Sequence, residues 1–116
     1  MPYVDGFILP VPTKNLAAYK KMASSFAKAC RKAGVLKYFE AVGDDLNVKF
    51  GLPMPKLVKP RKGETIVFAW VLFKSKAHRN ATWKKLMSDG SCQPPKKMPF
   101  DPKRMAWGGF KTIVGF

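Results

Sequence analysis

Apolar residues along this chain follow two kinds of spacing, and the clearest example of the first is the stretch TIVFAWVLFK at residues 65–74. Its first nine positions carry no charge. Alternate side chains of a β-strand point to opposite faces of the sheet, so the stretch divides into two apolar sets. One set is Ile66, Phe68, Trp70 and Leu72, and the other is Val67, Ala69, Val71 and Phe73. Both faces of this strand are therefore expected to be shielded from water.

Three further stretches are predicted to be β-strands because they are rich in β-branched and aromatic residues. They are residues 3–10, 35–42 and 104–114. Gly108 and Gly109 favour a β-bulge within the last of these strands, and another short strand could form at residues 47–50. The rest of residues 43–64 is punctuated by proline and glycine and is expected to be a functional or mobile loop.

The second kind of spacing, in steps of three and four, predicts two helices. The first spans residues 14–33, with Thr13 as its N-cap and Gly34 as the residue that ends it. The second spans residues 76–88, begins after the cap residue Ser75 and has a weaker apolar stripe. Both helices are expected to lie on the same side of the sheet.

The predicted elements follow the order βαββαβ, which is typical of ferredoxin-like α+β folds. All 116 residues are expected to form one domain, residues 1–116, with two helices on one face of a four-stranded sheet. No further segment is left to cover the other apolar face, and soluble monomers rarely expose such a patch. We therefore expect a homodimer in which two sheets pack face to face, a dimeric α+β barrel with a shared interior.

The charge balance is strongly basic, with 22 Lys and Arg against 7 Asp and Glu, a net charge of +15. Such a surface binds nucleic acid or another polyanion, or it is a solvated face without a dedicated partner. The candidate residues all lie on the two predicted helices. They are Lys20, Lys21, Lys28, Arg31, Lys32, Lys84 and Lys85. No aromatic platform for stacking bases accompanies them, because the sheet face that would supply it is assigned to the dimer.

Targeting and cysteine signals favour a cytoplasmic protein with no membrane partner. No apolar run approaches the roughly 20 residues that span a bilayer. The start of the chain, MPYVDGFILPVP, contains Asp5 and no positive charge, so it is a poor signal peptide. Cys30 and Cys92 have no metal-binding spacing and are interpreted as reduced thiols.

Asp5 is the most unusual residue of the first strand, because the rest of that strand is apolar. A buried carboxylate needs a partner, and Arg104, Lys74 or Tyr38 could supply one. In an apolar dimer cavity Asp5 could have a raised pKa and act as a general base. The alternative is a buried salt bridge that determines the strand register.

Two other residues complete the acid–base candidates, Glu40 and His78. Glu40, Asp44 and Asp45 are expected to cluster with Asp5, although the aspartate pair also fits a polar turn better than a metal site. His78 is the only histidine and falls in the first turn of a helix, where a neutral imidazole is favoured. It is either a general base or a hydrogen-bond acceptor at the helix start, as in a capping box.

Aromatic residues would line the interior of the expected barrel, together with a few polar groups. The predicted pocket residues are Tyr3, Tyr38, Trp70, Trp107 and Arg104, with Phe110 beside them. Such a set fits a pocket for a small molecule and equally an ordinary core. The sequence has no phosphate-binding loop, nucleophile elbow or zinc ligand set, so no cofactor or metal is expected.

Four strings, read together, resemble the YbaA-like family of small uncharacterised bacterial proteins. They are YVDGFILPVPTKNLAAY, VGDDL, FKSKAHRN and MPFDPKRMAWGGF. The resemblance covers residues 3–114 and implies a dimeric α+β barrel, a fold similar to that of antibiotic-biosynthesis monooxygenases and haem-degrading enzymes. The family has no established activity, so the resemblance implies a fold and leaves function open. Two features differ from the family: SDGSCQPPKK is shorter, and the chain is more basic.

These observations lead to two hypotheses. The first is an uncharacterised cytosolic homodimer that binds or transforms a small hydrophobic or aromatic molecule in an internal pocket. The second is a non-catalytic basic protein that binds polyanions through its helix faces.

Overall fold

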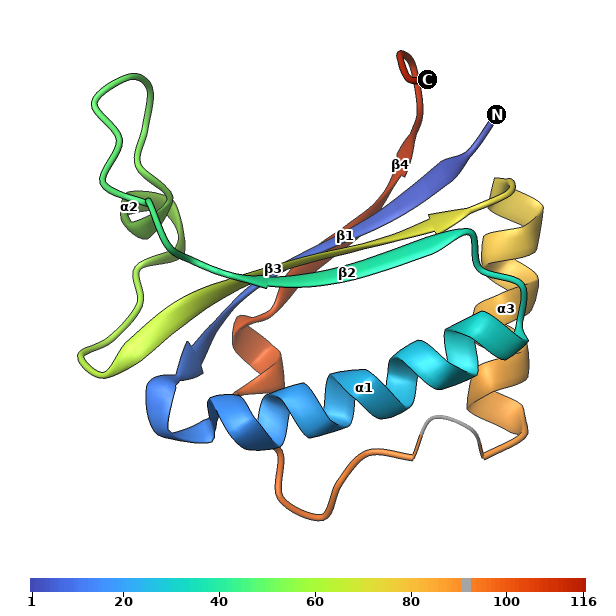
Figure 1. The fold of residues 1–116 in the computed structure, drawn as a ribbon, viewed down its shortest axis with the longest axis horizontal. Coiled ribbons are helices and arrows are strands. Elements are labelled where there is room, and N and C mark those ends of the chain that lie inside the picture. Colours follow the sequence, from blue (N-terminus) through green and yellow to red (C-terminus); the bar gives the residue numbers. More distant parts are fainter. Residues whose placement is uncertain (91–92) are drawn as a thin grey trace.

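A four-stranded antiparallel sheet forms the centre of the molecule, with the strand order β2-β3-β1-β4 (Figure 1). The computed structural model describes residues 1–90 and 93–116. The strands are β1 (Tyr3–Pro12), β2 (Lys37–Val42), β3 (Glu64–Phe73) and β4 (Ala106–Lys111). The fold class is therefore α+β, and the four predicted strands are confirmed, with ends that differ by a few residues.

β1 extends beyond the two prolines that were expected to end it. Pro10 pairs with Ile66 of β3 and Pro12 with Glu64. On the other side, pairing with β4 stops at Ile8. Proline lacks a backbone N–H and is tolerated where one side of a strand has no partner. Both prolines lie in the part of β1 that has a neighbouring strand on one side only.

The two longer helices, α1 (Leu16–Lys32) and α3 (Lys76–Ser88), cover one face of the sheet (Figure 1). This face carries the odd-numbered residues of β1 and β3. Leu9 and Val11 of β1 pack with Val67 of β3, Tyr19 of α1 and Phe100 in the main core cluster. The predicted division of β3 into two faces is confirmed here, because Val67, Ala69, Val71 and Phe73 are all at most 2% exposed.

The helix ends predicted from the sequence are confirmed at two of three positions. Gly34 follows α1 with a φ of +79°, a conformation that glycine adopts at little cost. Ser75 caps α3, since its Oγ accepts a hydrogen bond of 3.0 Å from the backbone N–H of His78. The prediction for Thr13 is wrong. Thr13 begins a 3-10 turn, η1 (Thr13–Asn15), which precedes α1.

The segment between β2 and β3 contains a short helix, α2 (Met54–Val58), instead of a strand at residues 47–50, so that prediction is wrong. Pro53 precedes this helix, and Lys59 ends it in a left-handed conformation with a φ of 55°. The segment projects from one end of the sheet and lies partly against β1 (Figure 1). Ile66, which points away from α1 and α3, is only 3% exposed at this end.

The predicted β-bulge at Gly108 and Gly109 is also wrong, because the pairing of β4 with β1 runs without interruption through both residues. The reason for glycine here is steric. A Cβ atom on Gly109 would overlap the ring of Tyr3. The glycine makes room for a side chain of the neighbouring strand and does not bend its own strand.

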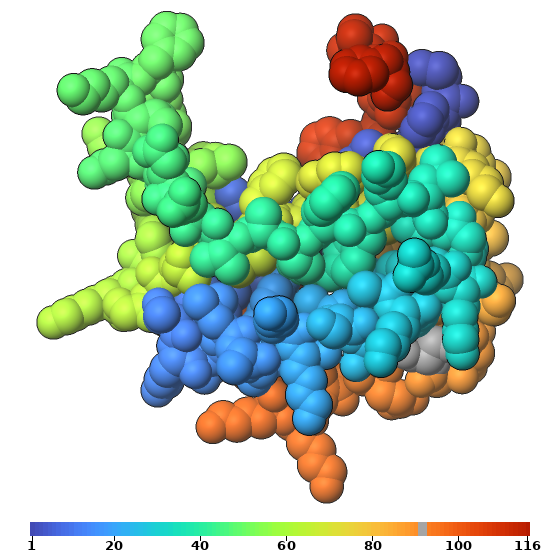
Figure 2. Space-filling view, in the orientation of Figure 1, coloured from blue at the N-terminus to red at the C-terminus, as the bar shows by residue number. Residues whose placement is uncertain are grey.

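The second face of the sheet is largely uncovered. Phe39, Phe68 and Phe110 alternate with the helix-facing residues and are 50%, 45% and 61% exposed. The ring of Phe39 lies 4.8 Å from that of Trp70, measured between centroids. The β2–β3 segment and residues 112–116 rise on either side and leave a hollow between them (Figure 2). This second face is called the open face below.

None of the helices in the described part of the chain has both the length and the apolar character needed to cross a membrane.

Candidate functional site

A cavity of about 710 Å³ lies between α1, α3 and the helix-covered face of the sheet. Residues 93–100, which lead from α3 towards η2 (Pro102–Arg104), form its outer wall. Its apolar lining includes Phe7, Met22, Phe26, Trp83, Met98 and Phe100. Within the described residues, Glu40 is the only carboxylate that lines it.

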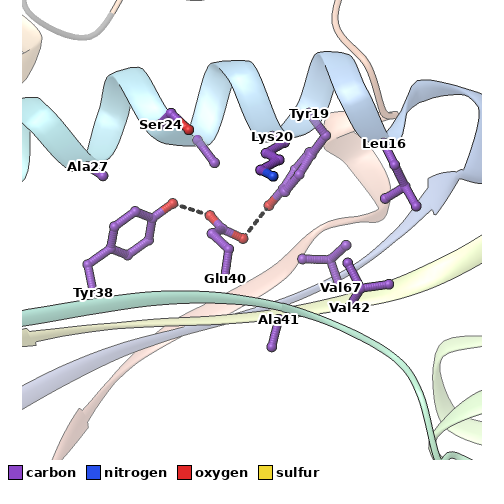
Figure 3. A pocket seen from close by; sticks show the side chains of 11 residues that line it. Leu16, Tyr19, Lys20, Ser24, Ala27, Tyr38, Glu40, Ala41, Val42 and Val67 are labelled. Carbon is purple, nitrogen blue, oxygen red and sulfur yellow. Dashed lines mark hydrogen bonds between the residues drawn. The ribbon is translucent and has the colours of Figure 1, made fainter.

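A second cavity of about 500 Å³ lies between α1 and β2. It shares Tyr19, Ala23, Tyr38 and Glu40 with the larger one. Figure 3 shows Tyr38 and Glu40 beneath α1, with the Glu40 carboxylate pointing up from β2 towards Tyr19 of the helix. The shared residues therefore separate two hollows on either side of the same helix.

The Glu40 carboxylate accepts hydrogen bonds from two phenols, one at each oxygen (Figure 3). Tyr19 on α1 donates to Oε1 at 2.7 Å, and Tyr38 on β2 donates to Oε2. Tyr38 and Glu40 are two positions apart on one strand, so both side chains point to the helix-covered face. Phe26 holds the Tyr38 ring edge-on at a centroid distance of 5.2 Å.

The surroundings of this cluster change the acidity of all three groups. Partial burial raises the pKa of Glu40 above its usual range, while the hydrogen bonds from Tyr38 and Tyr19 act in the opposite direction. Burial, with the nearby Glu40 carboxylate, raises the pKa of Tyr19 and of Tyr38. Both phenols therefore stay protonated at neutral pH and act as donors, and the Glu40 carboxylate accepts both hydrogen bonds.

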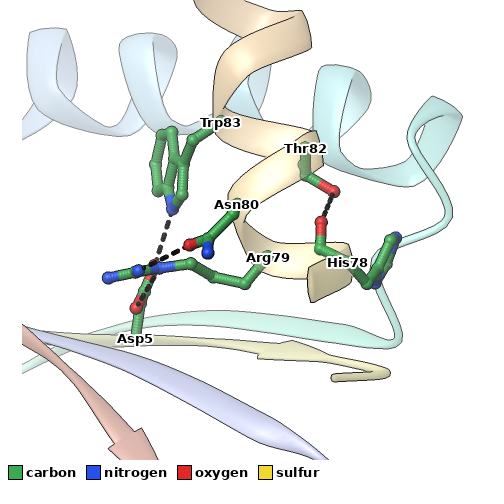
Figure 4. Close-up of polar contacts among 6 residues, drawn as sticks. All are labelled: Asp5, His78, Arg79, Asn80, Thr82 and Trp83. Carbon is green, nitrogen blue, oxygen red and sulfur yellow. Dashed lines mark hydrogen bonds and ion pairs between the residues drawn. The ribbon is translucent and has the colours of Figure 1, made fainter. Parts of the chain in front are cut away.

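Asp5 lies in a different cluster, fully buried between β1 and α3 (Figure 4). Both of its oxygens accept from Nε of Arg79 at 3.1 Å, and Oδ2 also accepts from the indole N–H of Trp83 at 2.6 Å. The predicted partners Arg104, Lys74 and Tyr38 are wrong, because the odd-numbered residues of β1 face α3 instead. This geometry corresponds to the salt-bridge alternative.

Arg79 connects Asp5 to the aromatic residues of the strand ends. Its guanidinium lies 5.4 Å from the ring centre of Tyr3 and 5.9 Å from that of Trp107, distances at which cations and aromatic faces attract. Trp107 also stacks on Phe7 at 5.7 Å. Tyr3 and Trp107 therefore stabilise this ion pair on the helix-covered face.

The predicted pocket set is divided by the sheet, so the expectation of one shared interior lined by all its members is wrong. Tyr38 lines the cavity beneath α1, and Tyr3 and Trp107 surround Arg79. Trp70 and Phe110 point to the open face instead. Arg104 pairs with Glu64 at 2.6 Å, where the guanidinium holds the pKa of Glu64 below its usual range.

His78 uses both ring nitrogens near the start of α3. Nδ1 accepts from the backbone N–H of Lys74 at 3.1 Å, and Nε2 lies 3.1 Å from the carbonyl oxygen of Ala33. Because a carbonyl only accepts, Nε2 carries the proton and donates it there. This arrangement corresponds to the helix-start alternative, and it also ties the end of α1 to the start of α3.

The expected carboxylate cluster does not form. In the described residues, no three His, Cys, Asp or Glu side chains approach closely enough to hold a metal ion. Asp44 and Asp45 are exposed in the turn after β2. Glu40 is therefore the one acid–base candidate that the fold places at a cavity, and Asp5 and His78 are held in other contacts.

Sequence reasoning missed Tyr19, Arg79 and Trp83 as site residues. Tyr19 was assigned to the apolar stripe of its helix, and it is indeed 7% exposed. A buried tyrosine hydroxyl usually has a hydrogen-bond partner, so Tyr19 could have been flagged as half of a polar pair. The partner itself lies 21 positions away.

The seven basic residues assigned to the helices are all exposed. None of them pairs with an acid in the described residues, where the ion pairs join Arg79 to Asp5 and Arg104 to Glu64. Cys30 is buried at 2% exposure beside Ala29 and Leu86. Cys92 lies outside the described residues, so the prediction that both thiols are reduced is untested.

The structure thus defines a small α+β protein with an apolar cavity and one tyrosine-bound carboxylate in its described lining. The family model described as "Protein of unknown function (DUF1428)" matches residues 2–102, and the chain belongs to this family. It is similar to the uncharacterized protein YbaA of Escherichia coli strain K12, with 36% identity over 115 residues and 98% of each chain covered. The same figures hold for YbaA of Shigella flexneri. The resemblance stated from the sequence is confirmed.

Proposed function

We propose that the protein binds a small hydrophobic or aromatic molecule in the cavity beneath α1, with Glu40 as the group that accepts a hydrogen bond or a proton from it. The observation that carries this proposal is the Glu40 carboxylate, which two phenols hold in the lining of a 710 Å³ cavity. Ligand sites usually enclose about 300 to 1,000 Å³ and combine apolar walls with a few polar groups.

The same geometry supports a proton transfer without a cofactor. A ligand with an acidic C–H or O–H bond would give its proton to a Glu40 oxygen and keep the electron pair of the broken bond. The raised pKa of Glu40 improves its match to proton transfer near neutral pH. Tyr19 and Tyr38 orient the carboxylate, because each phenol donates to one oxygen.

The experiment is a titration with phenylnaphthylamine, a neutral probe that fluoresces in apolar sites. We expect saturable binding, and we expect Ala18→Trp to lower the affinity at least about fivefold. Ala18 is exposed and belongs to the cavity lining, so the added ring would compete with the probe. The matched control is Ala106→Trp, which adds the same ring on the open face. Equal effects of the two variants, or no saturable binding, would overturn the proposal.

The proposal includes a homodimer with a ferredoxin-like arrangement and a sheet-to-sheet contact. Two observations support it: the antiparallel order β2-β3-β1-β4 with both long helices on one face, and exposed rings on the other. The charged strand residues of the open face are Lys37 and Glu64, so two copies could approach there in spite of their net charge. The proposed cytoplasmic location rests on the sequence alone.

A second candidate function is polyanion binding through α1 and α3. The observation that favours it is the exposure of all seven basic residues without acidic partners in the described residues. This function would use the exposed surfaces of the helices and would not require a ligand in the cavity.

A further inference from the structure

Two lysines from different elements line the outer part of the 710 Å³ cavity. Lys21 comes from α1, and Lys97 from the segment after α3. Both are exposed, and neither has an acidic partner among the residues that the structure describes. Figure 2 shows long side chains of α1 and of the orange segment projecting on the same side of the molecule. Two ammonium groups at one cavity mouth attract a negatively charged group.

The aromatic part of the lining is suited to flat apolar groups. Phe26 and Trp83 stack at 5.4 Å with an interplanar angle of 18°, and Phe7 meets Trp83 edge-on. Met22, Met87, Met98 and Met105 also belong to the lining. Thioether side chains adapt their shape and pack well against aromatic rings, so this wall favours an aromatic body over a polar one.

The carboxylate of Glu40, on the β2 side of the same lining, has the opposite charge to the two lysines. It would repel an anion and attract a hydrogen-bond donor. The lining thus combines two lysines from α1 and the segment after α3, an apolar aromatic wall and one carboxylate from β2. A ligand that matches these groups carries an acid that meets the lysines and a donor group that meets Glu40.

We propose that the cavity selects small aromatic anions, with the acidic group at Lys21 and Lys97 and the ring system against Phe26, Trp83 and the methionines. This inference rests on the proposed function, because the cavity must be a binding site for its polarity to matter. It adds the charge and the orientation of the ligand to that function.

The test compares two probes with the same aromatic skeleton on the intact protein. Anilinonaphthalene sulfonate is an anion, and phenylnaphthylamine is its uncharged counterpart. At low salt we expect the anion to bind about tenfold more tightly, because each partly exposed charge contact contributes a factor of a few. Salt should reduce this preference through screening.

Two double variants then show whether the cavity mouth causes the preference. Lys21→Gln with Lys97→Gln should reduce it to about twofold, mainly through weaker binding of the anion. Lys84→Gln with Lys85→Gln removes the same net charge from exposed positions of α3 outside the cavity lining, and should leave the preference intact.

The outcomes of these experiments distinguish a failure of the anion proposal from a failure of the proposed function. If both probes bind equally, or if the two double variants lose the preference equally, the anion proposal is wrong and the cavity remains a binding site. If neither probe responds to Ala18→Trp, the proposed function itself is wrong, and the inference fails with it.

Discussion

Tyr19 and Glu40 are joined by a hydrogen bond of 2.7 Å that connects α1 to β2. The same carboxylate accepts from Tyr38 of its own strand. One acidic side chain therefore links a helix to the edge of the sheet and lies between two cavities. The stability of the protein and the proposed chemistry of its cavity depend on the same ionisable group.

The pH dependence of stability should change in Glu40→Gln. Burial raises the pKa of Glu40 in the folded state above the ordinary value of 4.5. The stability that this shift contributes is fully present below that value and is lost as pH rises through the folded pKa. Glutamine does not titrate, so the variant should gain stability relative to wild type as pH rises. The gain should stay below about 1 kcal/mol, because Glu40 keeps contact with solvent.

The measurement is the free energy of unfolding by urea at a series of pH values from acid to neutral. The control is Glu64→Gln, at a carboxylate whose pKa is lowered by Arg104, which should lose relative stability as pH rises. A pH-independent difference between Glu40→Gln and wild type would contradict the prediction.

Removal of the guanidinium in Arg79→Ala should be strongly destabilising. Asp5 is fully buried and would lose its cationic partner while keeping only the indole N–H of Trp83. An uncompensated buried charge costs about 3 to 5 kcal/mol. Lys84→Ala on the exposed side of α3 should change stability by less than about 0.5 kcal/mol. The measurement is the free energy of unfolding of both variants in urea. Similar small losses of stability would show that the ion pair contributes little.

Gly109→Ala and Gly108→Ala should differ although the residues are neighbours on one strand. The new methyl group would overlap the Tyr3 ring at Gly109, whereas at Gly108 the nearest heavy atom is 3.9 Å away. We expect a loss of about 1 to 3 kcal/mol for the first and less than about 0.5 kcal/mol for the second. Thermal unfolding measures both. Tyr3→Ala should remove the difference, and its persistence would contradict the steric explanation.

The homodimer proposal predicts that Phe68→Lys gives a monomer. Phe68 is 45% exposed at the centre of the open face, and a buried unpaired charge there would oppose a sheet-to-sheet contact. Ala17→Lys adds the same charge on the exposed side of α1 and should leave the dimer intact. Sedimentation equilibrium gives the mass of each, and a wild-type protein that stays monomeric at high concentration would refute the proposal.

The polyanion alternative predicts strong retention on heparin that depends on α1. Neutralising Lys20, Lys28 and Lys32 should lower the salt concentration needed for elution, because each lost phosphate-like contact reduces the salt dependence. Neutralising Lys49, Lys56 and Lys62 in the β2–β3 segment removes the same charge and should have less effect. If the two triple variants elute together, the net charge alone accounts for retention.

Much of the fold could be predicted because it depends on local patterns. The alternation in residues 65–74 identified both faces of β3, and Gly34 and Ser75 marked helix ends through their own backbone and side-chain preferences. The errors at Thr13 and at residues 47–50 arose where several local signals compete. The bulge predicted at Gly108 and Gly109 was wrong, because the glycine at position 109 makes room for the Tyr3 ring on another strand.

The candidate site could be predicted only in part. Glu40 was selected as an acid and Tyr38 as an aromatic pocket residue, and their positions two residues apart on one strand mean that they share a face. The path of α1 across the sheet decides which face this is. It also decides that Tyr19 meets Glu40 there. The partner of Asp5 was missed for the same reason, since Arg79 lies 74 positions along the chain.

The sequence by itself determined the four strands and the two long helices, the two-sided apolar character of β3 and the strongly basic charge, because periodicity depends on residues close in the chain and charge depends on composition alone. Only the tertiary structure decided which carboxylate lies at a cavity and which is neutralised by a buried arginine. The physical reason is that the pKa and the partners of a side chain depend on what surrounds it in space. For Asp5 and Glu40 those surroundings come from two different helices, α3 and α1.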